Sequence, residues 1–389
     1  MTASAPDPPP YGTGTLSDLS RSLFAAVGVP GLDDALGIGS LAGACLLLVD
    51  GLGWRALQAA RDRAPFLSSL MEGAEARALS CGFPATTATS LASVGTGVPP
   101  GEHGVVGYTF AMPDLDRPMN ALRWEPYGPG KRTDLRSTYP PELVQPTSTL
   151  FERASACGVE TVMVGGVEHV ASGLTRAVFR GAGRRPGFGM GDVATTGAAL
   201  LRDRTARFVY AYHADLDTTA HVRGVGSESW AVHLSYVDRL AADLAERLPA
   251  GTVLAITGDH GTVDVDPADR IDLGHHPELL EGVAMVGGEA RARHVYAAPG
   301  AGADVLAAWT ETLGPRAWVR SREEAIQAGW FGPVVGPEAR SRIGDVVAAA
   351  RAAVAVVQRE LDGVQASLIG HHGSFDPAEQ LVPFLIHRT

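Results

Sequence analysis

The chain has 389 residues, of which 45% are hydrophobic and 19% charged, a composition typical of globular proteins. Its 32 Lys and Arg residues against 43 Asp and Glu residues give a net charge of −11, which disfavours binding to a nucleic-acid polymer. No apolar run reaches the roughly 20 residues of a membrane span. The charge remains compatible with a small phosphorylated ligand in a locally positive pocket.

The N-terminal sequence MTASAPDPPPYGTG has neither the basic nor the apolar region of a signal peptide. We therefore expect residues 1–20 to form a disordered lead. Cys45, Cys81 and Cys157 are odd in number and show no C-x-x-C spacing, which argues against a disulfide framework. Together these features predict a cytoplasmic protein.

Four short apolar segments are typical of buried central strands. They are ACLLLVD (44–50), ETVMVGG (160–166), RFVYAY (207–212) and TVLAITGD (252–259). Apolar residues at three- and four-residue spacing predict a covering helix at Trp230, Leu234, Val237, Ala241, Leu244 and Leu248. This alternation predicts an α/β fold, a three-layer αβα sandwich with a largely parallel central sheet. We assign residues 21–264 and 366–389 to this core.

Two other stretches are predicted to be insertions. Residues 111–148 are rich in Pro, Arg and Tyr with little periodicity, which is typical of a long, lid-like loop. Residues 265–365 have an α/β pattern of their own, including a predicted Ala-rich helix near 345–361. We expect these residues to form a smaller α/β cap domain inserted into the core.

Five separate segments place metal-ligating or nucleophilic side chains at predicted strand ends or turns. They are LLLVDGLG with Asp50, FPATTATS with Thr86 and Thr87, DTTAH with Asp217 and His221, TGDHG with Asp259 and His260, and GHHGS with His371 and His372. Ligands in such sheets collect beyond the carboxyl ends of the strands. Aspartate oxygens and neutral imidazoles together suit Zn²⁺ or Mn²⁺ better than Ca²⁺.

Each segment also has a simpler structural explanation. An Asp at a strand end is more often a helix cap or turn former than a metal ligand, and Asp217 alone would be assigned as a cap. His221 alone would be a solvated residue on the face of a helix. The spacing from Asp217 to His221 is one helical turn, however, so both can face one ion. Five such coincidences together favour a metal site.

In order and spacing these segments resemble the alkaline phosphatase superfamily, and most closely its nucleotide pyrophosphatase/phosphodiesterase branch. That branch has an Asp after its first strand, a Pro-x-x-Thr segment, an Asp-x-x-x-His, a Ser/Thr-Asp-His-Gly and a late His-Gly. The matching elements here are Asp50, Pro84–Thr87, Asp217 with His221, Gly258–Gly261, and His372-Gly373. The phrase TGVPPGEHGVVGY (96–108) is also similar to that branch.

The resemblance implies two divalent metal ions, Zn²⁺ or Mn²⁺, and a threonine nucleophile. The implied first site is Asp217, His221 and His372; the second is Asp50, Asp259 and His260, with Thr87 as nucleophile and further ligand. Thr86 and Thr89 are the alternatives to Thr87, and His371 is the alternative to His372. Where the branch often has a phosphate-binding Asn, this chain has Tyr108, which either donates to phosphate or is a packed aromatic.

The resemblance therefore implies a two-metal hydrolase of nucleotide phosphodiesters that acts through a phospho-threonine. Its expected substrates are cyclic or linear dinucleotides, such as cyclic di-AMP, or nucleotide pyrophosphates. The alternatives are a phosphonoacetate-type hydrolase or phosphomonoesterase, and a metal-binding, nucleotide-sensing pseudoenzyme.

A second phosphate of such a substrate needs a cationic partner. Arg291, Arg293 and His294 in GEARARHVY are candidates, because guanidinium binds phosphate with two hydrogen bonds. The alternative is that this segment is an edge strand with solvated charges.

Overall fold

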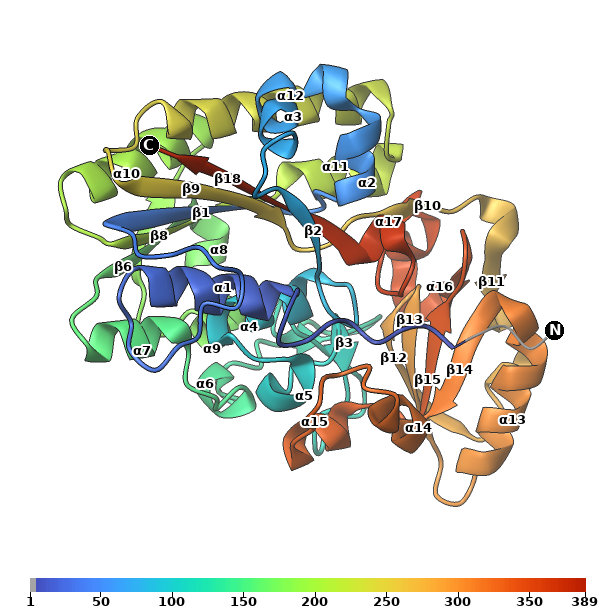
Figure 1. The fold of residues 1–389 in the computed structure, drawn as a ribbon. Coiled ribbons are helices and arrows are strands. Elements are labelled where there is room, and N and C mark those ends of the chain that lie inside the picture. Colours follow the sequence, from blue (N-terminus) through green and yellow to red (C-terminus); the bar gives the residue numbers. More distant parts are fainter. Residues whose placement is uncertain (1–4) are drawn as a thin grey trace.

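A seven-stranded sheet forms the centre of the computed structural model, which describes residues 5–389 (Figure 1). From edge to edge, the strands are β2 (Arg77–Ser80), β18 (Leu381–Arg388), β9 (Thr252–Gly258), β1 (Gly43–Val49), β8 (Phe208–His213), β6 (Thr161–Gly166) and β7 (Gly183–Gly187). β18 is antiparallel to β2 and β9, and the other pairs are parallel. The predicted, largely parallel sheet is confirmed.

Strand β1 is apolar throughout because both of its faces are covered. Cys45, Leu47 and Val49 belong to one hydrophobic core, and the alternating residues Ala44, Leu46 and Leu48 belong to another. A strand with two buried faces loses the polar alternation of a half-exposed strand. The four apolar segments of the sequence are accordingly β1, β6, β8 and β9.

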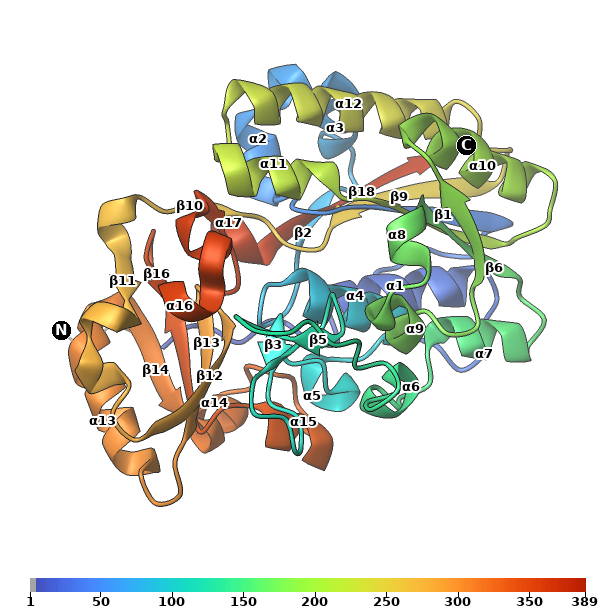
Figure 2. The same cartoon turned by 180° about the vertical axis from the view of Figure 1, so that it is seen from behind.

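Helices cover both faces of the sheet, so that three layers result (Figures 1 and 2). One face carries α2 (Trp54–Ala59), α3 (Pro65–Met71), α10 (Met190–Arg202), α11 (Asp215–Arg223) and α12 (Glu228–Ala245). The other carries α1 (Leu16–Ala26), α4 (Thr87–Thr96), α7 (Leu150–Ala156) and α9 (Gly173–Val178). Shorter helices are α5 (Pro100–His103), α6 (Pro141–Val144) and α8 (Val167–Val170). In the described chain, no helix has both the length and the apolarity that crossing a membrane requires.

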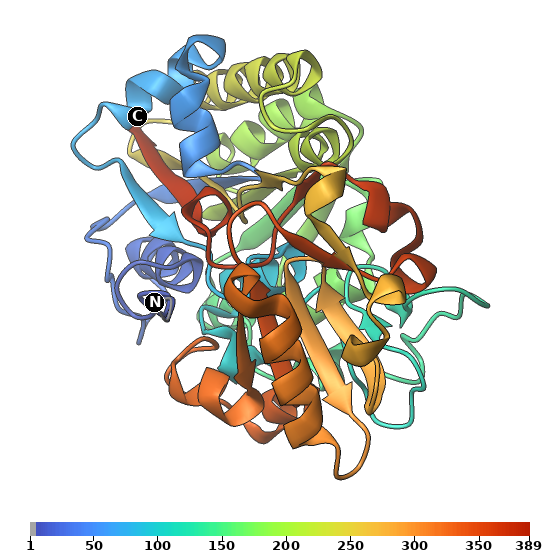
Figure 3. The same cartoon turned by 90° about the vertical axis from the view of Figure 1, so that its right-hand side faces the viewer.

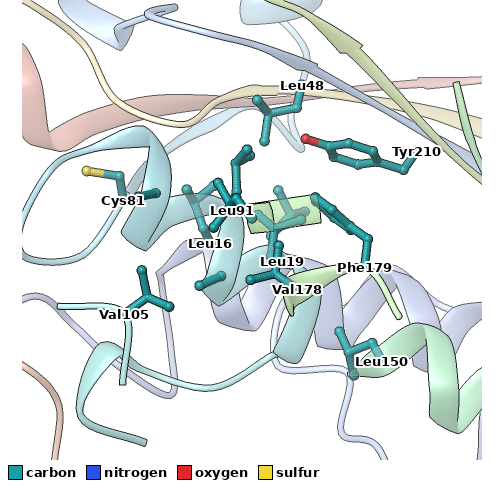
Figure 4. Close-up of a cluster of buried hydrophobic side chains, with 14 of the residues drawn as sticks. Leu16, Leu19, Leu48, Cys81, Leu91, Val105, Leu150, Val178, Phe179 and Tyr210 are labelled. Atoms are coloured by element: carbon teal, nitrogen blue, oxygen red, sulfur yellow. The ribbon is translucent and has the colours of Figure 1, made fainter. Parts of the chain in front are cut away.

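Helix α1 corrects the prediction of a disordered lead over residues 1–20. It begins at Leu16, and its side chains pack on α4 beneath the sheet, where Leu16 and Leu19 lie near Leu91 (Figure 4). Ahead of it, the Tyr11 hydroxyl donates a hydrogen bond to the Trp330 carbonyl, 2.9 Å away. Burial of apolar side chains therefore orders this segment despite its prolines. Residues 1–4 lie outside the described part of the chain.

The predicted lid-like loop, 111–148, has little regular structure. Its short strands β4 (Met119–Asn120) and β5 (Glu125–Pro126) pair with each other, and β4 also pairs with β3 (Thr109–Phe110). Helix α6 lies near the end of the loop. This part of the chain lies between the main sheet and the second sheet (Figure 2).

A second, antiparallel sheet forms within residues 265–365 (Figure 3). Its strands, in order, are β12 (Val283–Glu289), β13 (Ala292–Ala297), β15 (Val346–Ala350) and β14 (Ala317–Ser321). One face packs on α13 (Gly302–Leu313) through Trp309. The remaining elements are β11 (Arg270–Asp272), α14 (Arg322–Gln327), α15 (Pro337–Arg342), β16 (Ala355–Val357) and α16 (Arg359–Asp362).

The Ala-rich helix expected near 345–361 is wrong, because strands β15 and β16 lie in that stretch. Each of the five residues of β15 is buried between β13 and β14, so sheet pairing outweighs the helix preference of alanine. The face of this sheet opposite α13 joins a hydrophobic core of the main body through Ala292 and Val347. The separate cap domain over 265–365 stays a prediction.

Residues 265–365 leave and rejoin the main body at one place. Strand β10 (Val263–Asp264) is antiparallel to β17 (Gly370–His371), with Val263 opposite His371. The chain therefore returns beside the end of β9, although about a hundred residues separate the two segments. This return brings the late His-His pair to the carboxyl ends of the central strands.

A buried ion pair ties the second sheet to the main body. Arg291 follows β12, and Glu379 lies in α17 (Pro377–Gln380), just before β18. The Arg291 guanidinium donates to the Glu379 carboxylate over 2.7 Å, and neither side chain has exposed surface. Arg291 also donates to the carbonyls of Ala352 and Val354. Because the two charged side chains are buried, removing one of them leaves an uncompensated charge.

We predict that Arg291→Ala lowers the free energy of unfolding by about 3–5 kcal/mol, because it leaves the Glu379 carboxylate unpaired inside the protein. Arg388→Ala is the matched control, since Arg388 pairs with Glu75 at 2.6 Å with both side chains partly exposed. The control should cost at most about 1 kcal/mol. Chemical denaturation measures both variants, and equal losses would contradict this role of Arg291.

Candidate metal and phosphate site

Three aspartates meet at the carboxyl ends of neighbouring strands. Asp50 follows β1, Asp259 follows β9, and Asp217 lies in the first turn of α11, directly after β8. Because β1 pairs with both β8 and β9, its end lies between theirs. The three carboxyl groups are buried, with at most 9% of each residue exposed.

The sequence around Asp217 allows a second ligand to face the same point. Asp217 and His221 are one turn apart on α11, and the His221 Nε2 lies 3.0 Å from a carboxylate oxygen of Asp217. Gly51 makes room for them, because a Cβ there would lie 2.7 Å from the Cβ of Asp217. Gly51 also has a φ of +74°, which favours glycine. The predicted Asp-x-x-x-His pair is therefore brought together.

His260 lies between the other two aspartates. Its Nε2 is 3.5 Å from an oxygen of Asp50 and 3.5 Å from an oxygen of Asp259. The turn that holds it packs tightly, because a Cβ on Gly261 would lie 2.0 Å from the carbonyl oxygen of Ala378. Only glycine fits there, as the predicted sharp turn after β9 requires.

His372, rather than His371, completes the cluster. The ring of His372 stacks on that of His260 with centroids 3.6 Å apart, and its Nδ1 bonds to the Ala85 carbonyl at 2.8 Å. That bond leaves Nε2 as the free ligand nitrogen. The Nε2 of His371 instead bonds to the Leu368 carbonyl at 3.0 Å.

Thr87 is the first residue of α4, and its hydroxyl points into the aspartate–histidine cluster. Its Oγ1 lies 3.1 Å from the Nε2 of His260 and 3.4 Å from an oxygen of Asp50. The preceding Thr86 is the N-cap residue. Backbone N–H groups at the start of a helix favour a phosphate, so the hydroxyl stands where a phosphoryl group would be held.

The cluster carries more negative charge than its own side chains neutralise. Burial raises the pKa of Asp50 well above its usual range, and the carboxylates of Asp259 and Asp217 raise it further. Burial opposes ionisation of Asp217 too, but His221 outweighs burial and lowers the pKa of this carboxyl group. In return, Asp217 raises the pKa of His221 to about 9. A divalent cation would take the place of that proton.

The possible metal ligands form two groups that share His260, and His221 lies beside the first group, next to Asp217. Ligand atoms of Asp217, His260 and His372 lie within 4.8 Å of one another, as do those of Asp50, Asp259 and His260. One carboxylate oxygen of Asp217 and one of Asp259 are buried without a hydrogen-bond partner. Buried unpaired carboxylate oxygens are costly, and coordination to a cation satisfies them.

A cavity of about 710 Å³ opens in front of this cluster. Asp50, Thr87, Asp217, His221 and His372 line one part of it. The rest includes an aromatic and apolar wall, whose aromatic members are Tyr108, Tyr127, Phe179, Tyr210 and Tyr212. A charged end beside an apolar wall suits a ligand that has a phosphate and a flat ring.

Tyr108 lines the cavity at the centre of a chain of hydrogen bonds. Its hydroxyl oxygen accepts from the side-chain amides of Asn120 and Gln365, each at 2.7 Å. The Tyr127 hydroxyl donates to the other side of Gln365 at 2.6 Å. Because the Tyr108 oxygen accepts both amide bonds, its own proton remains free to be donated.

The structure contradicts the assignment of Arg291, Arg293 and His294 to substrate binding. All three side chains are buried and none lines the cavity. Arg291 is held by Glu379, and Arg293 by the carboxylate of Asp362. The His294 ring forms a hydrogen bond of 2.9 Å with the buried carbonyl of Val106. The segment is a central strand, so both the phosphate role and the solvated-edge alternative are wrong.

Two residues near the second sheet line the cavity although no sequence motif indicated them. Glu289, at the end of β12, lines the cavity with an oxygen 3.5 Å from the Nδ1 of His372. Burial raises the pKa of Glu289 well above its usual range. Gln365 lines the cavity as well. Neither residue belongs to a motif, and only the fold brings them to the site.

The comparisons with known proteins agree with this geometry. Residues 44–375 match the model of the type I phosphodiesterase / nucleotide pyrophosphatase family, which is most of the chain. The chain belongs to this family. The family match spans both the core and residues 265–365, so it includes each segment of the aspartate–histidine cluster.

Two solved structures have a similar fold. Murine ectonucleotide pyrophosphatase/phosphodiesterase 5 superimposes with a TM-score of 0.68 at 16% identity, over 89% of this chain and 88% of that one. Phosphonoacetate hydrolase from Sinorhizobium meliloti gives a TM-score of 0.66 at 19% identity, over 89% and 90% of the two chains. The alkaline phosphatase-like architecture is therefore confirmed.

One curated protein matches over a shorter stretch. Phosphopentomutase from Anaeromyxobacter dehalogenans is 30% identical over 178 residues, which are 44% of this chain and 43% of the mutase. The chain thus spans less than half the length of this curated relative.

We predict that Asp259→Asn removes about one of two bound ions per chain, because an amide is a weaker ligand than a carboxylate. Elemental analysis of protein reloaded with Zn²⁺ or Mn²⁺ after chelation measures the loss. Asp243→Asn is the control, because this carboxylate pairs with Arg239 and Arg247 on α12, away from the site. Wild-type protein without bound transition metal, or unchanged metal content in Asp259→Asn, would contradict the site.

Proposed function

We propose that this protein is a metal-dependent hydrolase of nucleotide phosphodiesters that acts through a phospho-threonine. The observation that carries the proposal is the Thr87 hydroxyl. It lies within 3.4 Å of both Asp50 and His260, at the start of a helix and facing a cavity. Membership of the phosphodiesterase family supports the same activity.

Thr87 would attack phosphorus with its Oγ1 and release its hydroxyl proton to solvent. A P–O bond forms to this oxygen while the bond to the leaving alcohol or phosphate breaks, and the leaving group takes up a proton from water. Water then cleaves the phospho-threonine, which restores the hydroxyl and releases the phosphorylated product. The amides at the start of α4 would hold the non-bridging oxygens in both steps.

The remaining site residues position the reacting groups. Two divalent ions, Zn²⁺ or Mn²⁺, when held by the aspartates and histidines, would lower the pKa of the Thr87 hydroxyl and stabilise developing charge. The Tyr212 hydroxyl donates to Asp50 and thereby fixes the orientation of this carboxylate. The Ala85 carbonyl fixes the His372 ring in the same way.

A nucleotide fits the rest of the cavity. The cavity has a volume of about 710 Å³, which is typical of a small-molecule site. Aromatic side chains such as those of its wall stack on nucleotide bases. An inactive Thr-to-Ala variant of the murine protein was solved in complex with AMP. We infer that cyclic or linear dinucleotides such as cyclic di-AMP, or nucleotide pyrophosphates, are the substrates. A cytoplasmic location is part of this proposal and is consistent with three free cysteines.

Phosphonoacetate is the second candidate substrate, because a phosphonoacetate hydrolase shares the fold. A small dianion with a carboxylate needs cationic side chains around it. Among the described residues that line the cavity, Arg123 alone is an arginine or lysine, and its side chain is 56% exposed. The large aromatic wall therefore favours a nucleotide over this small substrate.

Removing the nucleophile should abolish turnover and spare the metals. We predict that Thr87→Ala lowers kcat by at least about 1,000-fold with metal content unchanged, because carboxylates and imidazoles supply most ligands. Thr89→Ala is the matched control: Thr89 is buried two residues further along α4 and does not line the cavity. Near-normal kcat in Thr87→Ala, with loss in Thr86→Ala, would move the nucleophile by one residue.

Tyr108 should act as a hydrogen-bond donor to the substrate. We predict that Tyr108→Phe lowers kcat/KM for dinucleotides by about 10- to 100-fold, the effect of losing a bond to a charged oxygen. Tyr236→Phe is the control, because Tyr236 is 49% exposed and lies outside the cavity. Unchanged kcat/KM in Tyr108→Phe would make Tyr108 a packing residue.

A metal-reconstituted assay distinguishes the remaining possibilities. It would compare cyclic dinucleotides, linear dinucleotides, nucleotide pyrophosphates, p-nitrophenyl mono- and diesters and phosphonoacetate. Highest kcat/KM for a nucleotide diester supports the proposal, whereas preference for phosphonoacetate or a monoester supports the alternative hydrolases. Tight nucleotide binding with no turnover of any substrate would identify a nucleotide-sensing pseudoenzyme.

A further inference from the structure

A second cluster of potential metal ligands lies outside the cavity. It consists of His213, the last residue of β8, Asp215, the first residue of α11, and His233 on α12. One ligand atom from each residue lies within 4.8 Å of one from each of the other two. None of the three lines the cavity or belongs to the sets around Asp50 and Asp217.

The direction of strand β8 separates this cluster from the catalytic one. Side chains alternate along a strand, and Tyr210 and Tyr212 of β8 line the cavity. Val209 and Ala211 belong instead to the hydrophobic core beneath α10 and α12. His213 continues this second set, so its ring faces the α12 side of the sheet.

His213 is buried and His233 is half-buried, and each ring has a buried nitrogen without a hydrogen-bond partner. His213 is only 8% exposed and its Nε2 is buried without a hydrogen-bond partner. The Nδ1 of His233 is also buried and unpartnered. Within residues 5–389, the Asp215 carboxylate forms no hydrogen bond or ion pair with either ring, although all three converge. Leaving such buried nitrogens unpaired is destabilising, and a bound cation would remove that cost.

We propose that His213, Asp215 and His233 bind an additional divalent transition-metal ion of the Zn²⁺ type. Two imidazoles and one carboxylate are a usual ligand set for such ions, with water at the open position. Ligand atoms about 2.1 Å from a tetrahedral ion lie about 3.4 Å apart, so small side-chain rotations complete the geometry. Asp215 is exposed, which gives the ion and its water a path to the site.

The position of this site gives it a structural role. It joins the end of β8 to the start of α11 and to α12, and α11 carries Asp217 and His221. An ion held there would fix the start of α11 and, through it, the two catalytic ligands one turn further along. The ion would be a positioning group rather than a participant in the reaction.

Metal counting tests the proposal. Protein stripped with a chelator, reloaded with Zn²⁺ and freed of excess metal should hold about one ion fewer in His233→Ala and in Asp215→Asn than in wild type. His276→Ala is the matched control, because His276 pairs with Glu278 at 2.9 Å and belongs to none of the groups of possible metal ligands among the described residues.

The thermal midpoint is a second readout. Zn²⁺ should raise the midpoint of wild type and of His276→Ala more than that of His233→Ala or Asp215→Asn, since an ion bound only to the folded state stabilises it. Equal metal content and equal midpoint shifts in wild type and both variants would overturn the proposal. The test compares the metal content of wild type with that of each variant and looks for a difference of one ion. It therefore does not depend on whether the aspartate–histidine cluster at Thr87 holds two ions.

Discussion

Repulsion among three buried carboxylates is the constraint on which the rest of this structure depends. Asp50, Asp217 and Asp259 meet at the ends of three adjacent strands, where water is largely excluded. Like charges in such surroundings repel strongly, and their desolvation adds several kcal/mol for each ion. The raised pKa of Asp50 reflects this repulsion, and bound cations would relieve it. The glycines around the site serve the same end, because they let backbone and carboxylates approach closely enough to share an ion.

The topology delivers these ligands from distant parts of the chain. Parallel strands place all of their carboxyl ends at one edge, so β1, β8 and β9 each contribute one aspartate there. His372 arrives differently: about a hundred residues leave after β9 and return through the β10–β17 pair. Buried contacts such as Arg291–Glu379 hold the inserted residues against the core. The position of His372 therefore depends on the β10–β17 pair and on the buried contacts of the inserted residues.

What the sequence predicts depends on whether the cause is local. Continuous apolar runs predict buried strands, and the spacing of Asp217 and His221 predicts one helix face; both were correct because each needs only neighbouring residues. The roles of Arg291 and Arg293 failed, since their partners lie 88 and 69 residues away and a charge pattern does not reveal pairing at that distance. Glu289 was missed for the same reason. The disordered lead failed because composition does not show which surface a proline-rich segment covers.

The residues proposed for catalysis and those proposed for substrate recognition come from different parts of the fold. The groups proposed to hold metal and phosphate lie at the ends of β1 and β9, on α11 and α4, and directly after β17. The hydrogen-bond chain from Tyr127 through Gln365 to Tyr108 and Asn120 instead joins the loop region to the inserted residues. Changes in these peripheral segments can alter the shape and donors of the cavity without moving a carboxylate. The carboxylates are fixed by the strand ends that carry them, whereas the wall is built from segments outside the main sheet, so one fold can present different walls beside the same cluster.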